Sequence, residues 1–500
     1  MSKVTRVLVA NRGEIALRII RACHEEGLEA VAVYSAADRL SPHVRAADLA
    51  VEIGPAAPSE SYLRIDRLIE AARRTGAEAV HPGYGFLAER AAFAEAVDQA
   101  GLIFVGPPAA AIRAMGDKTE ARRRMRAAGV PVVPGADAPI TDPGEARALA
   151  DSMGYPVMVK AAAGGGGKGM RVVHAQAELE AALATAASEA LKAFGDASVY
   201  LEKFIERPRH VEIQILADAS GAAHLGEREC SVQRRHQKLL EEAPSTAVSP
   251  ELRERMGSAA VAAAEAVGYR GAGTCEFLLA ADGSFYFLEM NTRIQVEHPV
   301  TELVYGVDLV REQLRIAQGL AMRLPSGPPV PNGWSIECRI TSEDPANGFL
   351  PSTGRLEYLR VPAGPGVRWD SGFEVGNEVT LHYDSMVAKL IVWGADREEA
   401  LNRMARALDE LVVVGIATNQ GFQRRLVADP EFRRGAIDIQ FLDRRPDLAF
   451  APPDEDLCLA AAIAAALAEE DARHQRKPAV ALGADGESTW LRRARHEGLR

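Results

Sequence analysis

The stretch GTCEFLLAADGSFYFLEMNTRIQVEH, residues 273–298, carries the clearest folding signal in the chain. Two strand-like runs, 274–280 and 284–290, flank the dipeptide Asp282-Gly283. Asp-Gly is a frequent two-residue turn in β-hairpins, because both residues tolerate the left-handed backbone that such turns need. We therefore predict an antiparallel hairpin over this stretch.

The predicted hairpin brings two carboxylates face to face, with Glu276 directly opposite Glu289. Directly opposed side chains have Cβ atoms about 4.5–5.5 Å apart, and like charges at that separation are destabilising. A divalent cation resolves the repulsion, and Mg²⁺ bound by carboxylates together with phosphates is the simplest choice. The alternative is a solvated pair at a sheet edge, which the aromatic residues Phe277, Phe285 and Phe287 make less favourable. The pattern predicts a metal site.

Polar residues continue at every second position beyond the hairpin: Asn291, Arg293, Gln295 and Glu297 follow Glu289. In an extended chain these five side chains share one face. Nine extended residues span roughly 26 Å, so the polar residues either line a trough or the chain bends. Carboxylate, amide and guanidinium groups on one face suit a site that holds a metal and an anion beside a general base.

A glycine loop lies further upstream, in KAAAGGGGKG at 160–169. Consecutive glycines let the backbone approach a ligand closely, and their N–H groups can form a concavity that suits phosphate oxygens. Lys160 and Lys168 add positive charge. The loop is not of the Walker A type, which requires Ser or Thr where Gly169 stands. We predict phosphate binding here; the alternative is a hairpin tip without a ligand.

The length of 500 residues suits about three domains. With 47% hydrophobic and 25% charged residues, the composition is that of a globular protein. The net charge of −11 argues against nucleic acid and anionic membranes as partners, though a local basic cleft remains compatible. No stretch reaches the roughly 20 apolar residues of a membrane span, and the N-terminal residues lack the features of a signal peptide. The 5 scattered cysteines predict reduced thiols in a cytosolic protein.

Hydrophobic periodicity indicates an α/β chain. Apolar runs at 4–10 and 28–34, with helical spacing between them, predict a β-α-β opening to a parallel sheet. From 210 to about 315 we expect antiparallel strands with one helix, at 251–267. The other expected elements are strands at 156–161, 170–174, 199–205, 336–340 and 387–393, helices at 117–128, 177–194 and 397–411, and an alanine-rich helix after 452.

Long motifs distributed along the chain resemble biotin carboxylase, the ATP-grasp component of biotin-dependent carboxylases. They are VLVANRGEIALRIIRA (7–22), HPGYGFLAE (81–89), GDK (116–118), KAAAGGGGKGMRVV (160–173), ERPRHVEIQ (206–214), ECSVQRRHQKLLEEAPS (229–245), FLEMNTRIQVEHPVTE (287–302), FLPSTGRL (349–356) and YDSMVAKL (383–390). The resemblance implies an N-terminal α/β domain, an ATP-grasp domain with a glycine-rich lid and a C-terminal mixed α+β domain. The implied boundaries are 1–115, 116–334 (lid about 135–205) and 335–446, with a tail at 447–500.

The resemblance also implies the chemistry. ATP phosphorylates bicarbonate to carboxyphosphate, whose CO₂ passes to the N1′ atom of biotin. Glu297 is the implied base that deprotonates bicarbonate, and Arg339 is implied to bind biotin and stabilise its enolate. The remaining implied residues are Lys118, Lys160, Gly165, Gly166, Gly167, Lys168, Glu202, Lys203, His210, Gln233 and His236 for ATP, Glu276, Glu289 and Asn291 for Mg²⁺ or Mn²⁺, and Lys238, Arg293, Gln295 and Val296 for bicarbonate.

Partners follow from the same resemblance. The biotin-attachment pattern Met-Lys-Met is absent from the sequence, so we expect biotin on another polypeptide or on a C-terminal part outside this sequence. A carboxyltransferase subunit, a biotin carrier and a homodimer or larger complex are implied. Residues 490–500 resemble the opening of the linking domain in acyl-CoA carboxylase α subunits, so the chain is either a shortened α subunit or a free-standing subunit. The competing functions are another ATP-grasp carboxylate ligase and a silent ATP-grasp scaffold.

Overall fold

The computed structural model describes residues 4–136, 140, 142–161, 170–194, 198–324, 327–450, 455–475 and 493–495. The chain divides into two compact units, Met1–Ala449 and Phe450–Arg500. The predicted glycine loop, with Gly165, Gly166, Gly167 and Lys168, lies outside the described residues.

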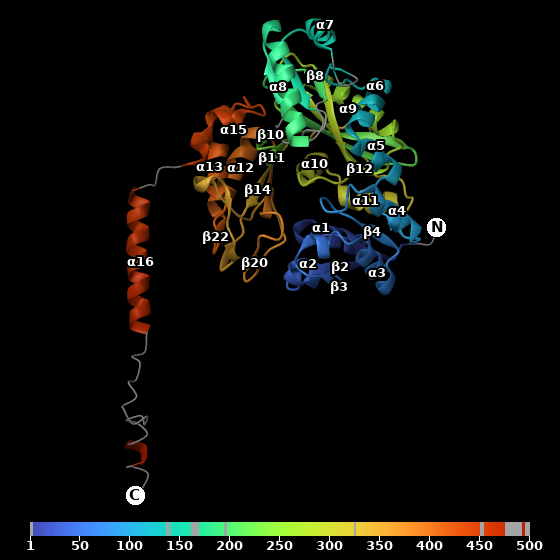
Figure 1. Ribbon diagram of the computed structural model, residues 1–500. Coiled ribbons are helices and arrows are strands. Elements are labelled where there is room, and N and C mark those ends of the chain that lie inside the picture. The colour runs from blue at the N-terminus through green and yellow to red at the C-terminus, as the bar shows by residue number, and fades with distance from the viewer. Residues whose placement is uncertain are drawn as a thin grey trace. The chain divides into compact units, whose positions relative to one another are not determined.

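The first unit begins with a five-stranded parallel sheet of order β3-β2-β1-β4-β5, which confirms the predicted β-α-β opening (Figure 1). Strand order reverses between β1 and β4, and ligands of open α/β sheets bind at such a point, beyond the carboxyl ends of the strands. The NRGE motif follows β1 and the HPGYG motif follows β4. The elements are β1 (Arg6–Val9), α1 (Gly13–Glu25), β2 (Glu29–Ser35), α2 (Pro42–Ala46), β3 (Leu49–Gly54), α3 (Ile65–Thr75), β4 (Ala79–His81), α4 (Ala91–Gln99) and β5 (Ile103–Phe104).

The centre of the first unit is an eight-stranded antiparallel sheet of order β13-β12-β9-β10-β11-β14-β21-β19. Pairing of β11 with β14, with Leu240 opposite Cys338, joins the middle region to the third region. The third region therefore extends the middle sheet rather than forming a sheet of its own. The strands are β9 (Arg209–Asp218), β10 (Gly221–Arg234), β11 (Gln237–Ala243), β12 (Gly271–Leu279), β13 (Phe285–Asn291), β14 (Trp334–Thr341), β19 (Val367–Ser371) and β21 (Met386–Gly394).

Helices α9 (Pro250–Glu265) and α12 (Arg397–Glu410) pack on this sheet, near the predicted positions. The expectation of a single helix between 210 and 315 was wrong, because α10 (His298–Tyr305) and α11 (Leu309–Ala317) also lie there. Both helices are short, but the sequence contains recognisable start and stop residues for them. Pro299 stands in the first turn of α10, Gly306 ends that helix in the left-handed conformation, and Asp308 caps α11.

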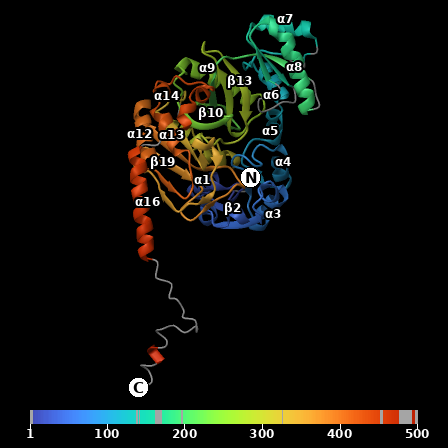
Figure 2. The same cartoon turned by 60° about the vertical axis from the view of Figure 1, so that its left-hand side comes forward.

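A small three-stranded sheet, β7-β6-β8, carries the residues on either side of the glycine loop. Its apolar face packs against two helices, α7 and α8, with Val157, Val159 and Leu201 fully buried (Figure 2). The elements are α7 (Pro143–Met153), β6 (Val157–Ala161), β7 (Met170–Val173), α8 (Gln176–Phe194) and β8 (Val199–Lys203).

The remaining helices of the first unit are α5 (Ala109–Gly116), α6 (Lys118–Ala127), α13 (Gln420–Ala428), α14 (Pro430–Arg433) and α15 (Phe441–Arg444). Short strands complete it: β15 (Glu343–Asp344), β16 (Leu350–Pro351), β17 (Gly354–Arg355), β18 (Tyr358–Arg360), β20 (Glu378–Val379) and β22 (Val412–Val414). The second unit contains the alanine-rich helix α16 (Glu455–Gln475), as predicted. Among the described residues, no helix combines the length and apolar character needed to cross a membrane.

Candidate active site

The hairpin of β12 and β13 places Glu276 opposite Glu289, as predicted. The turn differs from the two-residue turn that we expected. Leu279 pairs with Phe285, and the amide of Ala280 donates to the carbonyl of Ser284 at 2.8 Å, so three residues form the loop. A β-bulge between Glu276 and Phe277 shifts the register back. The loop and the bulge compensate, and the carboxylates remain opposed.

The chain leaves the sheet after Asn291, so the extended alternative for residues 291–297 was wrong and the chain bends. The bend still gathers the polar residues. Asn291 donates its amide to Glu276 Oε1 at 2.9 Å, and Gln295 donates to the same oxygen at 3.0 Å. Arg293 donates to Asn291 Oδ1 at 3.1 Å. The side chains converge because the backbone turns back on the hairpin.

Lys238, on β11, connects the acidic residues of the site. Its ammonium lies 2.6 Å from Glu212 Oε2, 3.0 Å from Glu276 Oε1 and 2.7 Å from Glu297 Oε1. Burial alone would lower the pKa of Lys238, but the surrounding acidic groups outweigh burial and raise that pKa. Lys238 is therefore a fixed cation at the centre of the cluster.

Glu297 lies between two cations. One carboxylate oxygen contacts Lys238, and the other accepts from Arg339 Nη2 at 2.9 Å. Burial would raise the pKa of Glu297, yet Lys238, Arg339 and Arg228 lower it, so the carboxylate is ionised and able to accept a proton. Arg339 is itself held by Glu241, which accepts from its Nε at 2.6 Å. The structure thus brings together the predicted base and the predicted biotin-binding arginine.

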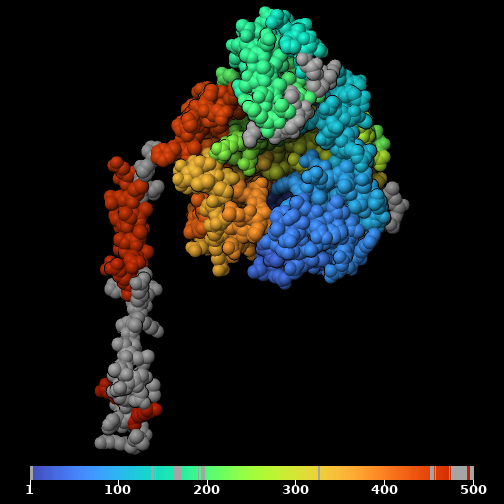
Figure 3. All heavy atoms as spheres, in the orientation of Figure 1, coloured from blue at the N-terminus to red at the C-terminus, as the bar shows by residue number. Residues whose placement is uncertain are grey.

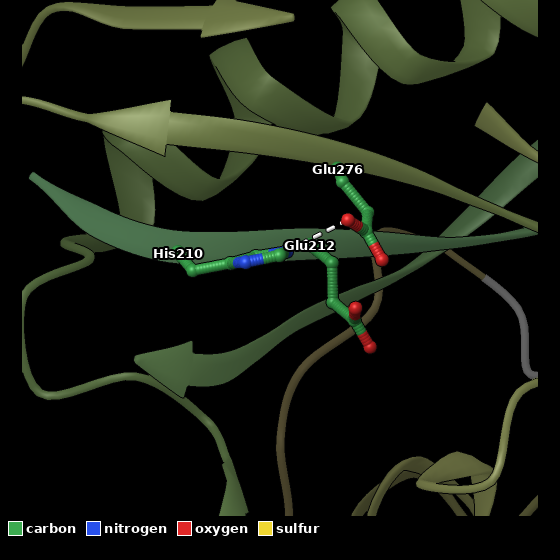
Figure 4. Close-up of side chains that lie close together, drawn as sticks. All are labelled: His210, Glu212 and Glu276. Atoms are coloured by element: carbon green, nitrogen blue, oxygen red, sulfur yellow. Dashed lines mark ion pairs between the residues drawn. The ribbon is translucent and has the colours of Figure 1, made fainter. Parts of the chain in front are cut away.

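His210 lies close to Glu212 and Glu276, the two carboxylates that Lys238 also contacts (Figure 4). His210 and Glu212 project from β9, and His210 Nε2 lies 2.9 Å from Glu276 Oε2. Gln233, another predicted nucleotide residue, lies nearby, with its Nε2 atom 3.3 Å from Nδ1 of His210. Lys238 and His210 together lower the pKa of Glu276 despite its burial.

Glu289 differs from Glu276, because no hydrogen bond or ion pair to its side chain is recorded within the described part of the chain. Burial, followed by repulsion from Glu276, raises the pKa of Glu289, and Lys118 opposes this only from a distance. An uncompensated carboxylate beside an ionised one fits a divalent cation with oxygen ligands. The chemistry of these two side chains therefore suits Mg²⁺.

The remaining predicted nucleotide residues are spread around the site. Lys160 and Arg122 both form ion pairs with the buried Glu202. Lys203 donates instead to the backbone carbonyls of Gly154, at 2.9 Å, and Tyr155, at 3.2 Å. Lys118 is exposed at the start of α6, and His236 is exposed in the β10–β11 turn. Neither is brought into the cluster around Lys238.

Sequence reasoning missed Glu212 and Arg228. Arg228, on β10, is fully buried and donates to Glu212, Gln214, Thr274, Gln295 and Thr301. The alternation His210, Glu212, Gln214 was a usable signal, since period two puts all three on one face of a strand. It became informative only with the strand order, which places β9 between β12 and β10.

Three family models match successive parts of the chain. Residues 3–112 match the biotin carboxylase N-terminal domain, residues 117–324 the ATP-binding domain of the carbamoyl-phosphate synthase L chain, and residues 337–444 the biotin carboxylase C-terminal domain. The chain belongs to the biotin carboxylase family. It is an ATP-dependent ligase that carboxylates biotin with bicarbonate.

Relatives of this biotin carboxylase are similar over most of its length. A pyruvate carboxylase subunit of Methanothermobacter thermautotrophicus is 54% identical over 440 residues, which are 88% of this chain and 89% of the relative. The biotin carboxylase of a Nostoc species is 54% identical over 441 residues, 88% of this chain and 99% of the relative.

A solved structure has the same fold. The biotin carboxylase domain dimer of Hydrogenobacter thermophilus 2-oxoglutarate carboxylase, in complex with MgADP, ADP and bicarbonate, superposes with a TM-score of 0.80. It is 46% identical, and the match covers 91% of this chain and 100% of that structure. The three-domain biotin carboxylase architecture is therefore that of this protein.

Proposed function

We propose that Glu297 is the general base of biotin carboxylation and that Lys238, Arg293, Gln295 and Val296 bind bicarbonate. Bicarbonate is a weak nucleophile, and removal of its proton strengthens it. A positioned carboxylate contributes typically 10²–10⁴-fold as a base. The contact that carries the proposal is the ion pair between Lys238 and Glu297 at 2.7 Å, because it puts an anion-binding cation beside the base.

The two cations that hold Glu297 also make it a weak base in the free enzyme, since they lower its pKa. Bicarbonate bound at Lys238 would share the charge of that ammonium. The ammonium of Lys238 would then stabilise the ionised form of Glu297 less, because it would also neutralise bicarbonate. The pKa of Glu297 would therefore rise toward that of an ordinary carboxylate. Substrate binding thereby activates the base.

Arg339 lies on the other side of Glu297, and we propose that it binds the ureido oxygen of biotin. Negative charge develops on that oxygen when N1′ loses its proton, before N1′ attacks CO₂, and a pre-aimed guanidinium stabilises the developing charge. Glu241 and Glu297 both hold Arg339, which limits its movement. The arginine thus needs little reorganisation during the reaction.

We further propose that the nucleotide lies between the small sheet and the hairpin. Its phosphates or ribose would contact Lys118, Lys160 and His210, the glycine loop would close over the phosphates, and Glu202 with Lys203 would lie at the adenine edge. Gln233 and His236 complete the proposed nucleotide residues. Glu276 and Glu289, with Asn291 nearby, would hold Mg²⁺, or Mn²⁺ in its place. The bound metal neutralises phosphate charge during phosphoryl transfer.

Replacing Glu289 by Gln tests the metal proposal. We expect the Mg²⁺ concentration required for half-maximal ADP release to rise at least tenfold, because one charged ligand is lost while the fold is kept. ADP release titrated with Mg²⁺ measures this, and Mg²⁺ binding by calorimetry gives a readout without turnover. Glu251→Gln, at an exposed position on α9, serves as the matched control. An unchanged Mg²⁺ dependence would contradict a metal role for the opposed carboxylates.

We propose the wider assembly on the same grounds. The biotin would be carried by a separate carrier protein or domain, and a carboxyltransferase subunit would select the acyl acceptor. The Methanothermobacter relative is named as a subunit, which supports a multi-subunit enzyme. The Hydrogenobacter structure is a dimer, which supports a homodimer. We also propose a cytoplasmic location. The proposed domain boundaries are 1–115, 116–334, 335–446 and 447–500, and one β-sheet continues across the boundary at 334.

The decisive experiment is ADP release from Mg·ATP, measured with and without bicarbonate and with and without a high concentration of free biotin. We expect release to depend on both compounds. Turnover indifferent to both would favour another ATP-grasp ligase. Nucleotide binding without any turnover would favour a silent scaffold.

A further inference from the structure

Lys389, on β21, is a fully buried lysine that has no part in the roles assigned above. Its ammonium donates to the main-chain carbonyl of Val296 at 2.8 Å. Val296 immediately precedes Glu297. Lys389 also lies directly opposite Arg339 in the pairing of β21 with β14, so both side chains are on the face of the sheet toward the site.

Other bonds also hold the backbone of the segment that contains Val296: Thr292 donates its amide to Glu89 at 3.1 Å, the carbonyl of Gln295 lies 2.7 Å from His298 Nδ1, and Val300 donates to the carbonyl of Glu297 at 3.3 Å. The bond from Lys389 is the one that reaches the peptide immediately before Glu297. The segment follows the end of β13 at Asn291 and precedes α10, and its residues belong to no strand. Lys238 and Arg339 do hold the carboxylate of Glu297, but both are proposed substrate ligands, so their contacts change as bicarbonate and biotin bind. The bond from Lys389 reaches the backbone instead. It can therefore keep the peptide before Glu297 in place throughout the reaction.

The charge of Lys389 is balanced by one carboxylate from the N-terminal domain, Glu14, and by two on neighbouring strands, Glu337 on β14 and Asp370 on β19. Glu14, in the NRGE motif at the start of α1, lies 3.2 Å from the ammonium, and it also accepts a hydrogen bond from Tyr84 of the HPGYG motif. Burial opposes the charge, whereas Glu14, Glu337 and Asp370 support it and raise the pKa of Lys389.

The two N-terminal motifs are tied to each other, because the side-chain amide of Asn11 donates to the carbonyls of Pro82, at 2.8 Å, and Tyr84, at 2.7 Å. Figure 3 shows the surfaces of the N-terminal residues (blue) and of the third region (orange) side by side, and α1 packs against β19 there. Lys389 is thus the point at which the N-terminal domain, the third region and the segment of the base meet.

We propose that Lys389 is a positioning residue for the reaction: by holding the carbonyl of Val296, it fixes Glu297 at the distance from bicarbonate that proton transfer needs. The proposal rests on the role of Glu297 proposed above. A displacement of about 1 Å in a reacting group can lower a rate about 100-fold. The NRGE and HPGYG motifs then contribute by supplying the counter-charge that keeps this lysine ionised while buried.

The test uses the full chain with Lys389→Met. Because that change alone leaves Glu14 buried without its partner charge, the main variant combines Lys389→Met with Glu14→Gln, which removes both charges of the pair. Glu14→Gln alone is the matched background, and Lys192→Met, at an exposed position on α8, is the lysine control. ADP binding by calorimetry counts the folded, nucleotide-competent fraction of each variant.

We expect the double variant to lose about 100-fold in kcat for bicarbonate- and biotin-dependent ADP release, with the KM for Mg·ATP within about threefold of the parent. Glu14→Gln alone should fall between the parent and the double variant in kcat, because Glu337 and Asp370 still support the charge of Lys389. A purely structural role would lower the competent fraction and leave kcat per competent molecule unchanged. A double variant that turns over within fivefold of the parent per competent site would overturn the proposal.

The same assay separates this proposal from the proposed function. A parent enzyme without bicarbonate-dependent ADP release would reject the role of Glu297 itself. A normal parent that loses activity in Glu297→Gln but not in the double variant would reject the role of Lys389 alone.

Discussion

Glu297→Gln is expected to lower bicarbonate-dependent turnover by about 10²–10⁴-fold, the usual contribution of a positioned general base. Glutamine has nearly the same shape as glutamate, but its one oxygen can accept from only one of Lys238 and Arg339, which contact different oxygens of the carboxylate. Glutamine cannot accept the proton of bicarbonate. The loss should therefore appear in kcat, whereas nucleotide binding, which involves other residues, should be retained.

Steady-state ADP release measures the effect on turnover, and calorimetric ADP binding checks that the site is intact. Glu398→Gln, an exposed position in the first turn of α12, is the matched control and should behave as the parent does. Turnover of Glu297→Gln at the rate of the parent would remove Glu297 from the mechanism.

Arg228→Met is expected to destabilise the protein by about 3–5 kcal/mol, the usual loss when one partner of a buried ion pair is removed. The guanidinium is fully buried and lies 2.5 Å from Glu212 Oε1. It also donates to Gln214 at 2.6 Å and to Gln295 at 2.9 Å. Methionine fills much of the volume but leaves these groups without their donor. Because Gln295 is among them, the bicarbonate site should be distorted as well.

Thermal unfolding measures this loss. Arg39→Met is the control, because Arg39 forms an exposed ion pair with Glu52 and its removal should change the unfolding midpoint far less. A midpoint for Arg228→Met equal to that of the control would show that the buried network does not stabilise the fold.

The candidate site was predictable where local chain geometry determines it. An antiparallel hairpin pairs residues close in sequence, so the opposed Glu276 and Glu289 could be found from the turn and the alternation alone. The predicted pairing is correct even though the turn has three residues rather than two, because the β-bulge beside Glu276 compensates for the additional turn residue. The polar residues at every second position from Glu289 to Glu297 likewise indicated which side chains would come together. The chain nevertheless bends after Asn291 instead of continuing as a strand.

The roles of Lys238, Arg339 and Arg228 could not be derived in the same way. Their contacts join strands that are far apart in the sequence: Arg228 and Glu212 meet because β9 pairs with β10, and Arg339 reaches Glu297 because β14 joins the same sheet beside β11. The long motifs identified Lys238 and Arg339 by resemblance, but they did not reveal which carboxylate each cation holds.

The sequence by itself determined the parallel opening sheet, the hairpin, its opposed carboxylates and the family. Those features depend on local periodicity, on turn residues and on motifs that can be read along the chain. Only the tertiary structure decided that one eight-stranded sheet connects the middle and third regions, and that Glu297 lies between Lys238 and Arg339. Likewise, only the fold brings the buried Lys389 to the backbone of Val296. Strand order and burial decide such contacts. Both arise when distant segments pack together, and a charge buried without a partner is then costly.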